Sequence, residues 1–205
     1  MYFPQLKRIE NKEDLAIYSQ TYETCSGLPV PMDYLANADN QVFAIYCKGE
    51  MAGGFVLGQH ARTRTIEVFA QEAQRPQVYA QLEPNLVTTE ICCFWMAPHF
   101  RRQTFFNFFT WLGLAYAVAK YGSSQLLFGT CSQGLARLYA LSGKAVLLHR
   151  DHINGKSTYI FMGHSRFLFT SVLTILKSKL VRIFWAHSMK NAPLYPLRAV
   201  THTGR

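Results

Sequence analysis

The pattern of apolar and polar positions in the first half of the chain predicts a strand, a helix and a β-hairpin. Residues 6–10 fit a short strand, and Asn11 is placed to cap a helix that ends near residue 24. Residues 41–48 and 51–58 are apolar, rich in strand-forming side chains and separated by a short polar turn. They therefore predict two antiparallel strands joined by that turn.

Beyond residue 65 the pattern is helical at first and then alternates between strand and helix. Residues 66–82 have a helix-forming composition interrupted by Pro76, so one helix and two shorter pieces both remain open. Apolar runs rich in β-branched and aromatic residues then predict strands, and longer stretches without a breaker predict helices. The order is strand, helix, strand, helix and hairpin, over residues 87–96, 103–121, 125–130, 132–141, and 144–149 with 158–162.

Length and charge distribution divide the chain into one domain and a basic tail. With 205 residues, of which 49% are apolar and 16% charged, the chain can bury one core of ordinary size. The net charge is +9, but residues 152–205 hold eight Lys or Arg side chains and no Asp or Glu. We therefore expect an α/β domain over residues 1–163 and a basic C-terminal helical tail over residues 164–205. We do not expect nucleic acid to be the partner of a domain that is close to neutral.

Cysteine and histidine spacing argues against a metal site and against a disulfide framework. The five cysteines form no C-x-x-C pair, and an odd number cannot pair completely. The run His149-Arg150-Asp151-His152 holds metal-ligand types, but residues so close together seldom converge, which favours a solvated hairpin. The N-terminus has early charges and no apolar run, so we expect reduced thiols and a cytoplasmic protein.

The tail mixes aromatic and aliphatic side chains with basic ones over residues 166–185. Lys177, Lys179 and Arg182 interrupt its apolar run, so it is not expected to span a membrane. Three interpretations remain: an interfacial membrane helix, a docking surface for a carrier protein, and a helix that covers the core. Aromatic side chains favour association with a membrane surface, on the inner face of the cell membrane. They are Phe167, Phe169, Phe184 and Trp185.

The element order and three local patterns resemble the GNAT acyltransferases over residues 40–163. Glu90 lies in the strand predicted over residues 87–96, A-P-H-F-R-R follows from residue 97, and L-A-R-L-Y-A-L-S-G-K from residue 135 precedes the last hairpin. The resemblance implies a mixed central sheet flanked by helices. It also implies transfer of an acyl group from an acyl-CoA or acyl carrier protein thioester to a small amine, without a tightly bound cofactor.

In the GNAT family a loop of the form R-x-x-G-x-G or A binds a pyrophosphate through free amides at the start of a helix. Arg101 and Arg102 fit this pattern, whereas Thr104 and Phe106 occupy its two small positions. Because of this departure, the chain is more similar to the acyl-homoserine-lactone and long-chain N-acyl amino acid synthases, which accept acyl groups from acyl carrier protein. The donor-binding residues that the resemblance implies are Trp95, Met96, Ala97, Arg101, Arg102, Gln103 and Thr104.

Two residues carry the expected chemistry. The resemblance implies that Tyr139, in the pattern L-Y-x-x-x-G, protonates the departing thiolate, and packing of its ring in the core is the alternative. Glu90 is an isolated carboxylate within an apolar strand, and we predict that it deprotonates the acceptor amine, directly or through water. The alternative for Glu90 is an ion pair with Arg101 or Arg102.

Three further interpretations rest on weaker patterns. Cys131 follows a strand, but no local signature supports a nucleophile, so a buried inert thiol is favoured. The aromatic residues at positions 105–111, though more often core, suit a helix that lines an acyl-chain tunnel, with Phe94, Trp95 and Met96 lining it from the strand. The rival to an enzyme is a non-catalytic GNAT-fold binding module that acts at a membrane surface or on nucleic acid.

Overall fold

Seven strands form one mixed sheet in the computed structural model, which describes residues 3–101, 103–141, 144–153, 155–174 and 177. The strand order is β1-β2-β3-β4-β5-β7-β6, and neighbours are antiparallel except β4 with β5. The strands are β1 (Gln5–Ile9), β2 (Asn40–Cys47), β3 (Glu50–Gly58), β4 (Thr88–Met96), β5 (Gln125–Thr130), β6 (Ala145–Ile153) and β7 (Lys156–His164). The helices are α1 (Lys12–Ser26), α2 (Met32–Leu35), α3 (Arg64–Phe69), α4 (Arg75–Tyr79), α5 (Thr104–Tyr121) and α6 (Gln133–Leu141), with 3₁₀ turns at Glu72–Gln74 and Ser165–Phe167.

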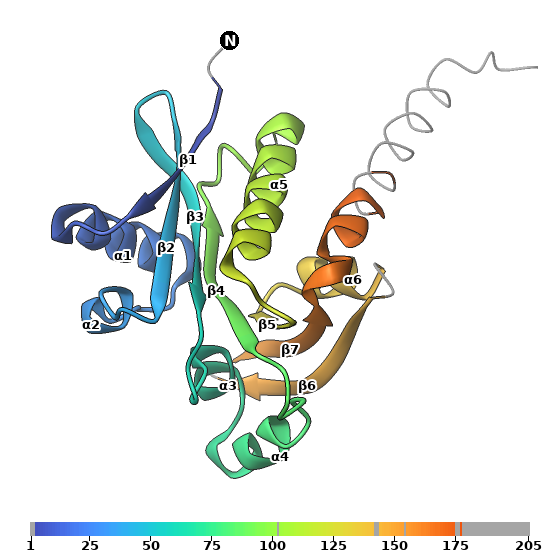
Figure 1. The fold of residues 1–205 in the computed structure, drawn as a ribbon. Helices are drawn as coiled ribbons and strands as arrows, with labels where there is room; N and C mark the ends of the chain where they lie inside the picture. Colours follow the sequence, from blue (N-terminus) through green and yellow to red (C-terminus); the bar gives the residue numbers. More distant parts are fainter. Residues whose placement is uncertain (1–2, 102, 142–143, 154, 175–176, 178–205) are drawn as a thin grey trace, which may run out of the picture.

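Helices cover both faces of the sheet, so the core has two halves (Figure 1). On one face α1 and α2 pack on the first four strands, and α3 and α4 pack on β5 and β7. On the other face lie α5 and α6. The neighbours Leu126 and Leu127 of β5 enter the cores of opposite faces, as the two-residue period of a strand requires. The predicted mixed α/β sheet flanked by helices is confirmed.

The structure settles one stretch that the sequence left open and extends another. Residues 66–82 contain two separate helices, because Pro76 lies in the first turn of α4, where its missing N–H costs no hydrogen bond. The last hairpin is longer than predicted, since β6 and β7 both continue to the turn that contains Gly155, whose φ is +74°. The segment His149–His152 therefore lies within β6 of this hairpin.

The start of the C-terminal tail packs on the α5 face of the sheet. Residues 168–174 are helical, with Leu168 and Val172 in the core beside α5, whereas Phe169 and Leu173 are exposed. Most of the predicted tail lies outside the described residues, so its separation from the domain stays a prediction. Within the described part of the chain, no helix is both long and apolar enough to cross a membrane.

Candidate functional site

β4 and β5 separate half-way along the sheet. Their parallel register runs only from Thr88 to Ile91 of β4, although β4 continues to Met96 and both strands are fully described. A register shift against β3 adds a residue to β4 around Cys93, whose φ is +49°. The buried Tyr18 hydroxyl of α1 donates a hydrogen bond to the Cys93 carbonyl at 2.8 Å, which holds this bulge. The second half of β4 therefore presents backbone groups to a gap instead of to β5.

A cavity of about 410 Å³ lies at this gap. Its lining comes from α1, α3, the second half of β4, the end of β5 and α6. The residues predicted from the sequence to act on the donor divide into three groups. The cavity is lined by Trp95, Met96, Arg101 and Tyr139. Ala97 is buried, and Gln103 is exposed. The structure does not describe Arg102 or the side chain of Thr104.

The first amides of α5 have no partner within the helix. The Asn107 amide donates to the Gln103 carbonyl at 3.0 Å. The amides of residues 104–106 come before it, and the first amides of an α-helix have no acceptor within that helix. The Phe106 side chain does not close this end of the helix. It is 2% exposed and stacks on Phe100 within the core, with ring centroids 4.6 Å apart. Phe106, which replaces the small residue of the GNAT pattern, is thus a core side chain and is not part of the cavity lining.

Arg101 fastens the loop after β4 to two neighbouring elements. Its Nε donates to the Met96 carbonyl at 2.8 Å, and its Nη2 donates to the Cys25 carbonyl at 3.3 Å. The guanidinium therefore bridges the ends of β4 and α1 at the edge of the cavity. Arg101 is therefore not the partner of Glu90, and that half of the alternative for the carboxylate is wrong. The other half names Arg102, which lies outside the described residues.

Glu90 is fully buried in β4 and accepts three hydrogen bonds, two from amides at the start of α3 and one from a hydroxyl of α2. Its Oε2 accepts from the Arg64 amide at 3.0 Å and from the Tyr34 hydroxyl at 3.1 Å. Its Oε1 accepts from the Thr65 amide. These amides open α3, so the carboxylate satisfies the helix N-terminus and complements its dipole. A carboxylate has about four acceptor positions, which leaves one on Oε1.

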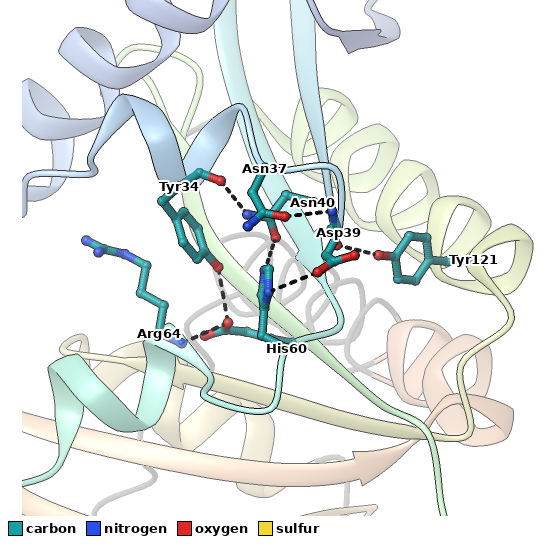
Figure 2. Close-up of polar contacts among 8 residues, drawn as sticks. Tyr34, Asn37, Asp39, Asn40, His60, Arg64 and Tyr121 are labelled. Carbon is teal, nitrogen blue, oxygen red and sulfur yellow. Dashed lines mark hydrogen bonds and ion pairs between the residues drawn. The ribbon is translucent and has the colours of Figure 1, made fainter.

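Tyr34 of α2 links Glu90 to a polar cluster at the ends of β2 and β3 (Figure 2). The Tyr34 carbonyl accepts from Asn40 Nδ2 at 2.5 Å, and Asn40 Oδ1 lies 2.7 Å from His60 Nε2. Burial raises the pKa of the Tyr34 hydroxyl, and the acidic groups of Cys92 and Glu90 raise it further. The hydroxyl therefore stays protonated and remains a hydrogen-bond donor to the carboxylate.

Arg64 is the cationic side chain that α3 adds to the cavity lining. Its guanidinium lies over the Tyr34 ring, with Cζ 5.6 Å from the centroid, and donates to the Pro29 carbonyl. Sequence reasoning missed Tyr34 and Arg64, because both lie in helices of six residues or fewer. The usable signal was the pair of threonines at positions 63 and 65, a pattern typical of a helix start.

Tyr139 of α6 lines the cavity and also packs against the aromatic core of the α5 face. Its ring packs edge-on against Phe128, Phe161 and Trp111, with centroids 4.9, 5.5 and 6.2 Å away. Burial raises the pKa of its hydroxyl, so the phenol stays protonated well above neutral pH. The side chain both packs in the aromatic core and lines the cavity, so the two interpretations of Tyr139 do not exclude each other.

The thiol and the histidine cluster show no features of reactive groups. Burial raises the pKa of the Cys131 thiol and the nearby Lys156 lowers it in part, so the net shift favours the unreactive thiol form. Asp151 accepts hydrogen bonds from the amide and the side chain of Gln71 at 3.1 and 2.9 Å, and lies 3.5 Å from His149 Nε2. Among the described residues, no group of three His, Cys, Asp or Glu side chains could hold a metal ion.

The aromatic residues predicted to line an acyl-chain tunnel lie in different environments. Trp111 stacks on Phe94 with ring centroids 5.2 Å apart, and both line a second, apolar cavity of about 70 Å³ on the α5 face. Phe105 is 43% exposed, and Trp95 and Met96 line the larger cavity instead. The prediction that these residues together line a single tunnel is therefore wrong.

Three solved structures of similar architecture are distant from this chain in sequence. FeeM, an N-acyl amino acid synthase from uncultured soil microbes, has a TM-score of 0.62 and 9% identity, covering 83% of this chain and 96% of its own. The AHL synthase LasI has a TM-score of 0.58 and 11% identity, covering 80% and 90%. A protein of the GNAT family from Desulfovibrio desulfuricans has a TM-score of 0.53 and 14% identity, covering 80% and 99%.

No protein-family model matches the sequence, and no curated protein matches it. The structural likeness extends over about four fifths of the chain. At identities of 9–14%, this likeness establishes the fold of the chain and does not establish its activity. The chain has the GNAT fold, as its sequence pattern predicts.

Proposed function

We propose that the protein transfers an acyl group from a phosphopantetheine thioester, carried by coenzyme A or by acyl carrier protein, to an amine. The observation that carries this proposal is the cavity of about 410 Å³ where β4 leaves β5, with Tyr139 on its lining. A thioester arm is long, narrow and rich in amides, so it fits a gap that has free strand edges on one side. The neighbouring proteins FeeM and LasI are an N-acyl amino acid synthase and an AHL synthase, which agrees with acyl transfer.

The donor is expected to lie along β4. Amides of the pantetheine arm would pair with the backbone of the second half of β4, past Ile91, as an added strand does. Its phosphate would then meet the amides of residues 104–106 and the favourable dipole of α5. Arg101 and Arg102 would supply positive charge at that end. The strand edge at Trp95, Met96 and Ala97 would hold the arm and its carbonyl.

The reaction needs one acid and one base. The amine nitrogen attacks the thioester carbonyl carbon, a C–N bond forms, the C–S bond breaks, and the sulfur leaves as a thiolate. Tyr139 would give its proton to that sulfur, a role that a phenol of raised pKa can fill because it is still protonated. Glu90 would take the ammonium proton through a water at the remaining acceptor position of Oε1, because the carboxylate itself is sealed from the cavity.

The acceptor is expected to carry a carboxylate next to its amine. Arg64 lines the cavity, and in the described residues its guanidinium contacts a carbonyl and an aromatic ring rather than an acidic side chain. A guanidinium has five N–H donors and matches a carboxylate in two parallel hydrogen bonds. Since the Arg64 amide also binds Glu90, an amino acid held by Arg64 would bring its amine toward the proposed base. FeeM makes N-acyl amino acids, which fits this acceptor class.

Mass analysis of products tests the proposal. The full chain is incubated with acetyl, hexanoyl and dodecanoyl thioesters of coenzyme A and of acyl carrier protein, each with a pool of amino acids and simple amines. We expect an amide product, and we expect it from amino acids rather than from amines without a carboxylate. A thioester that binds and stays unreacted with every acceptor would support the binding module instead.

A further inference from the structure

The second cavity, on the α5 face, is apolar and adjoins the proposed reaction site. It has a volume of about 70 Å³ and is lined by residues of β4, α5, β5, α6, the start of β6, the end of β7 and the segment that follows β7. Ile91, Phe94, Gly129 and Tyr139 line both this cavity and the larger one. The two cavities therefore adjoin through these four residues, which include the proposed acid.

One wall of the second cavity is built by the start of the C-terminal segment. Phe167, Leu168, Ser171 and Val172 all line it. Val172 is 2% exposed and packs in the same core cluster as Trp111 of α5. The wall is held at its other side by Lys144, whose Nζ lies 4.8 Å above the Phe167 ring. A segment that looks appended in the sequence thus closes an apolar space inside the domain.

We infer that this cavity takes the acyl chain of the donor and that the segment 167–172 sets the longest chain that fits. The inference rests on the proposed acyl transfer. The position supports it, because an acyl chain begins one bond from the sulfur that Tyr139 would protonate, and Tyr139 lines the cavity. The lining supports it as well, since aromatic and aliphatic side chains such as Phe94, Trp111 and Leu114 bind hydrocarbon and offer little to a polar group.

The size of the cavity gives the chain length. One water molecule needs about 10–15 Å³ of such volume, so 70 Å³ has room for roughly five non-hydrogen atoms. With the carbonyl carbon outside, this corresponds to an acyl group of about six carbons. An acetyl group would leave the cavity empty, and a much longer chain would have to displace the wall that contains Val172.

Substitution of the wall tests the inference with a matched control on the same helix. Val172→Phe fills the cavity, whereas Leu173→Phe adds the same ring to a side chain that is 56% exposed. We measure kcat/KM with acetyl, hexanoyl and dodecanoyl thioesters. Wild-type protein and the Leu173 variant should prefer hexanoyl, and the Val172 variant should lose at least about 10-fold on hexanoyl and change acetyl less than about 2-fold. Val172→Ala, which enlarges the space, should shift the preference to longer chains.

Each outcome separates the inference from the function on which it rests. Product formation with the same chain-length profile in Val172→Phe, Val172→Ala and wild type would overturn the inference and leave acyl transfer standing. The absence of product from every donor would overturn the proposed function, and binding of S-hexanoyl pantetheine by calorimetry then still tests the cavity. Equal affinity of wild type and Val172→Phe for that probe would overturn it. Thermal melts show whether the variants fold, and the alanine variant serves if the phenylalanine variant does not.

Discussion

At the scale of single residues, the contacts and burial of Tyr139 bear most directly on its proposed role as the general acid. Its ring is fixed by edge-on contacts with three aromatic neighbours, and burial raises its pKa. We predict that Tyr139→Phe keeps these ring contacts and the fold but lowers kcat by about 10²- to 10⁴-fold, because it removes a general acid.

The choice of leaving group distinguishes acid catalysis from packing in this variant. A thioester of a more acidic thiol needs no proton as it departs, so Tyr139→Phe should act on an aryl thioester at a rate close to that of wild type. Because the pKa of Tyr139 is raised, the wild-type rate should also show no loss from its ionisation at the pH where a free tyrosine titrates. An equal loss on both kinds of donor would assign Tyr139 a packing role.

Glu90 supports structure whatever its part in catalysis. Removing its carboxylate leaves the amides of Arg64 and Thr65 and the hydroxyl of Tyr34 without their buried acceptor. A buried donor without an acceptor costs about 1–3 kcal/mol, so Glu90→Ala should lower the free energy of unfolding by at least about 3 kcal/mol. Glu90→Gln should lose less, because its amide oxygen still accepts. Urea denaturation measures both, with Glu72→Ala at an exposed position as the control.

At the scale of elements, the start of α5 and the loop before it form the proposed phosphate end of the donor site. Arg101→Ala should raise KM for an acyl-CoA by about 10-fold, because one charged contact with phosphate is lost. It should leave KM for the matching N-acetylcysteamine thioester unchanged, since that donor has no phosphate. Arg137→Ala, at an exposed position of α6 outside the cavity lining, is the control. A parallel loss on both donors would show that Arg101 acts through its hydrogen bonds to Met96 and Cys25.

The order of the elements could be predicted from the sequence, because strand and helix periods are local properties of the chain. The run at 87–96 reads as a buried strand whether or not its neighbours are known, and β4 occupies Thr88–Met96. The direction of a side chain at a helix start is not local. Phe106 occupies a position where the GNAT loop pattern has a small residue, yet its ring lies in the core, where it stacks on Phe100.

The environment of Glu90 could not be predicted for the same reason. An isolated acid within an apolar strand indicates that a partner must exist. Two of the partners are backbone amides 25 and 26 residues away in the sequence. They begin a helix of six residues, which is too short to be predicted from its hydrophobic pattern. Sequence reasoning therefore identified the residue and missed the contacts that define what it can do.

At the scale of the whole molecule, the excess positive charge is concentrated in the last quarter of the chain. Eight Lys or Arg side chains and no acidic residue fall within residues 152–205. Within that region, the helical residues 168–174 have one face in the core and expose Phe169 and Leu173 one helical turn apart on another. An exposed apolar pair followed by basic residues suits the surface of an anionic membrane.

We therefore predict that the full chain floats with vesicles containing phosphatidylserine and not with vesicles of phosphatidylcholine alone. Each basic side chain near an anionic surface contributes about 1 kcal/mol, so replacing Lys177, Lys179 and Arg182 with Gln should weaken binding by roughly 100-fold. These changes leave the cavity wall at Val172 untouched, so acyl transfer to a dissolved acceptor should stay within about 2-fold of wild type. Equal recovery of the two proteins would show that the basic tail does not hold the chain at a membrane, and competition by an acidic carrier protein would then test docking as the role of its charge.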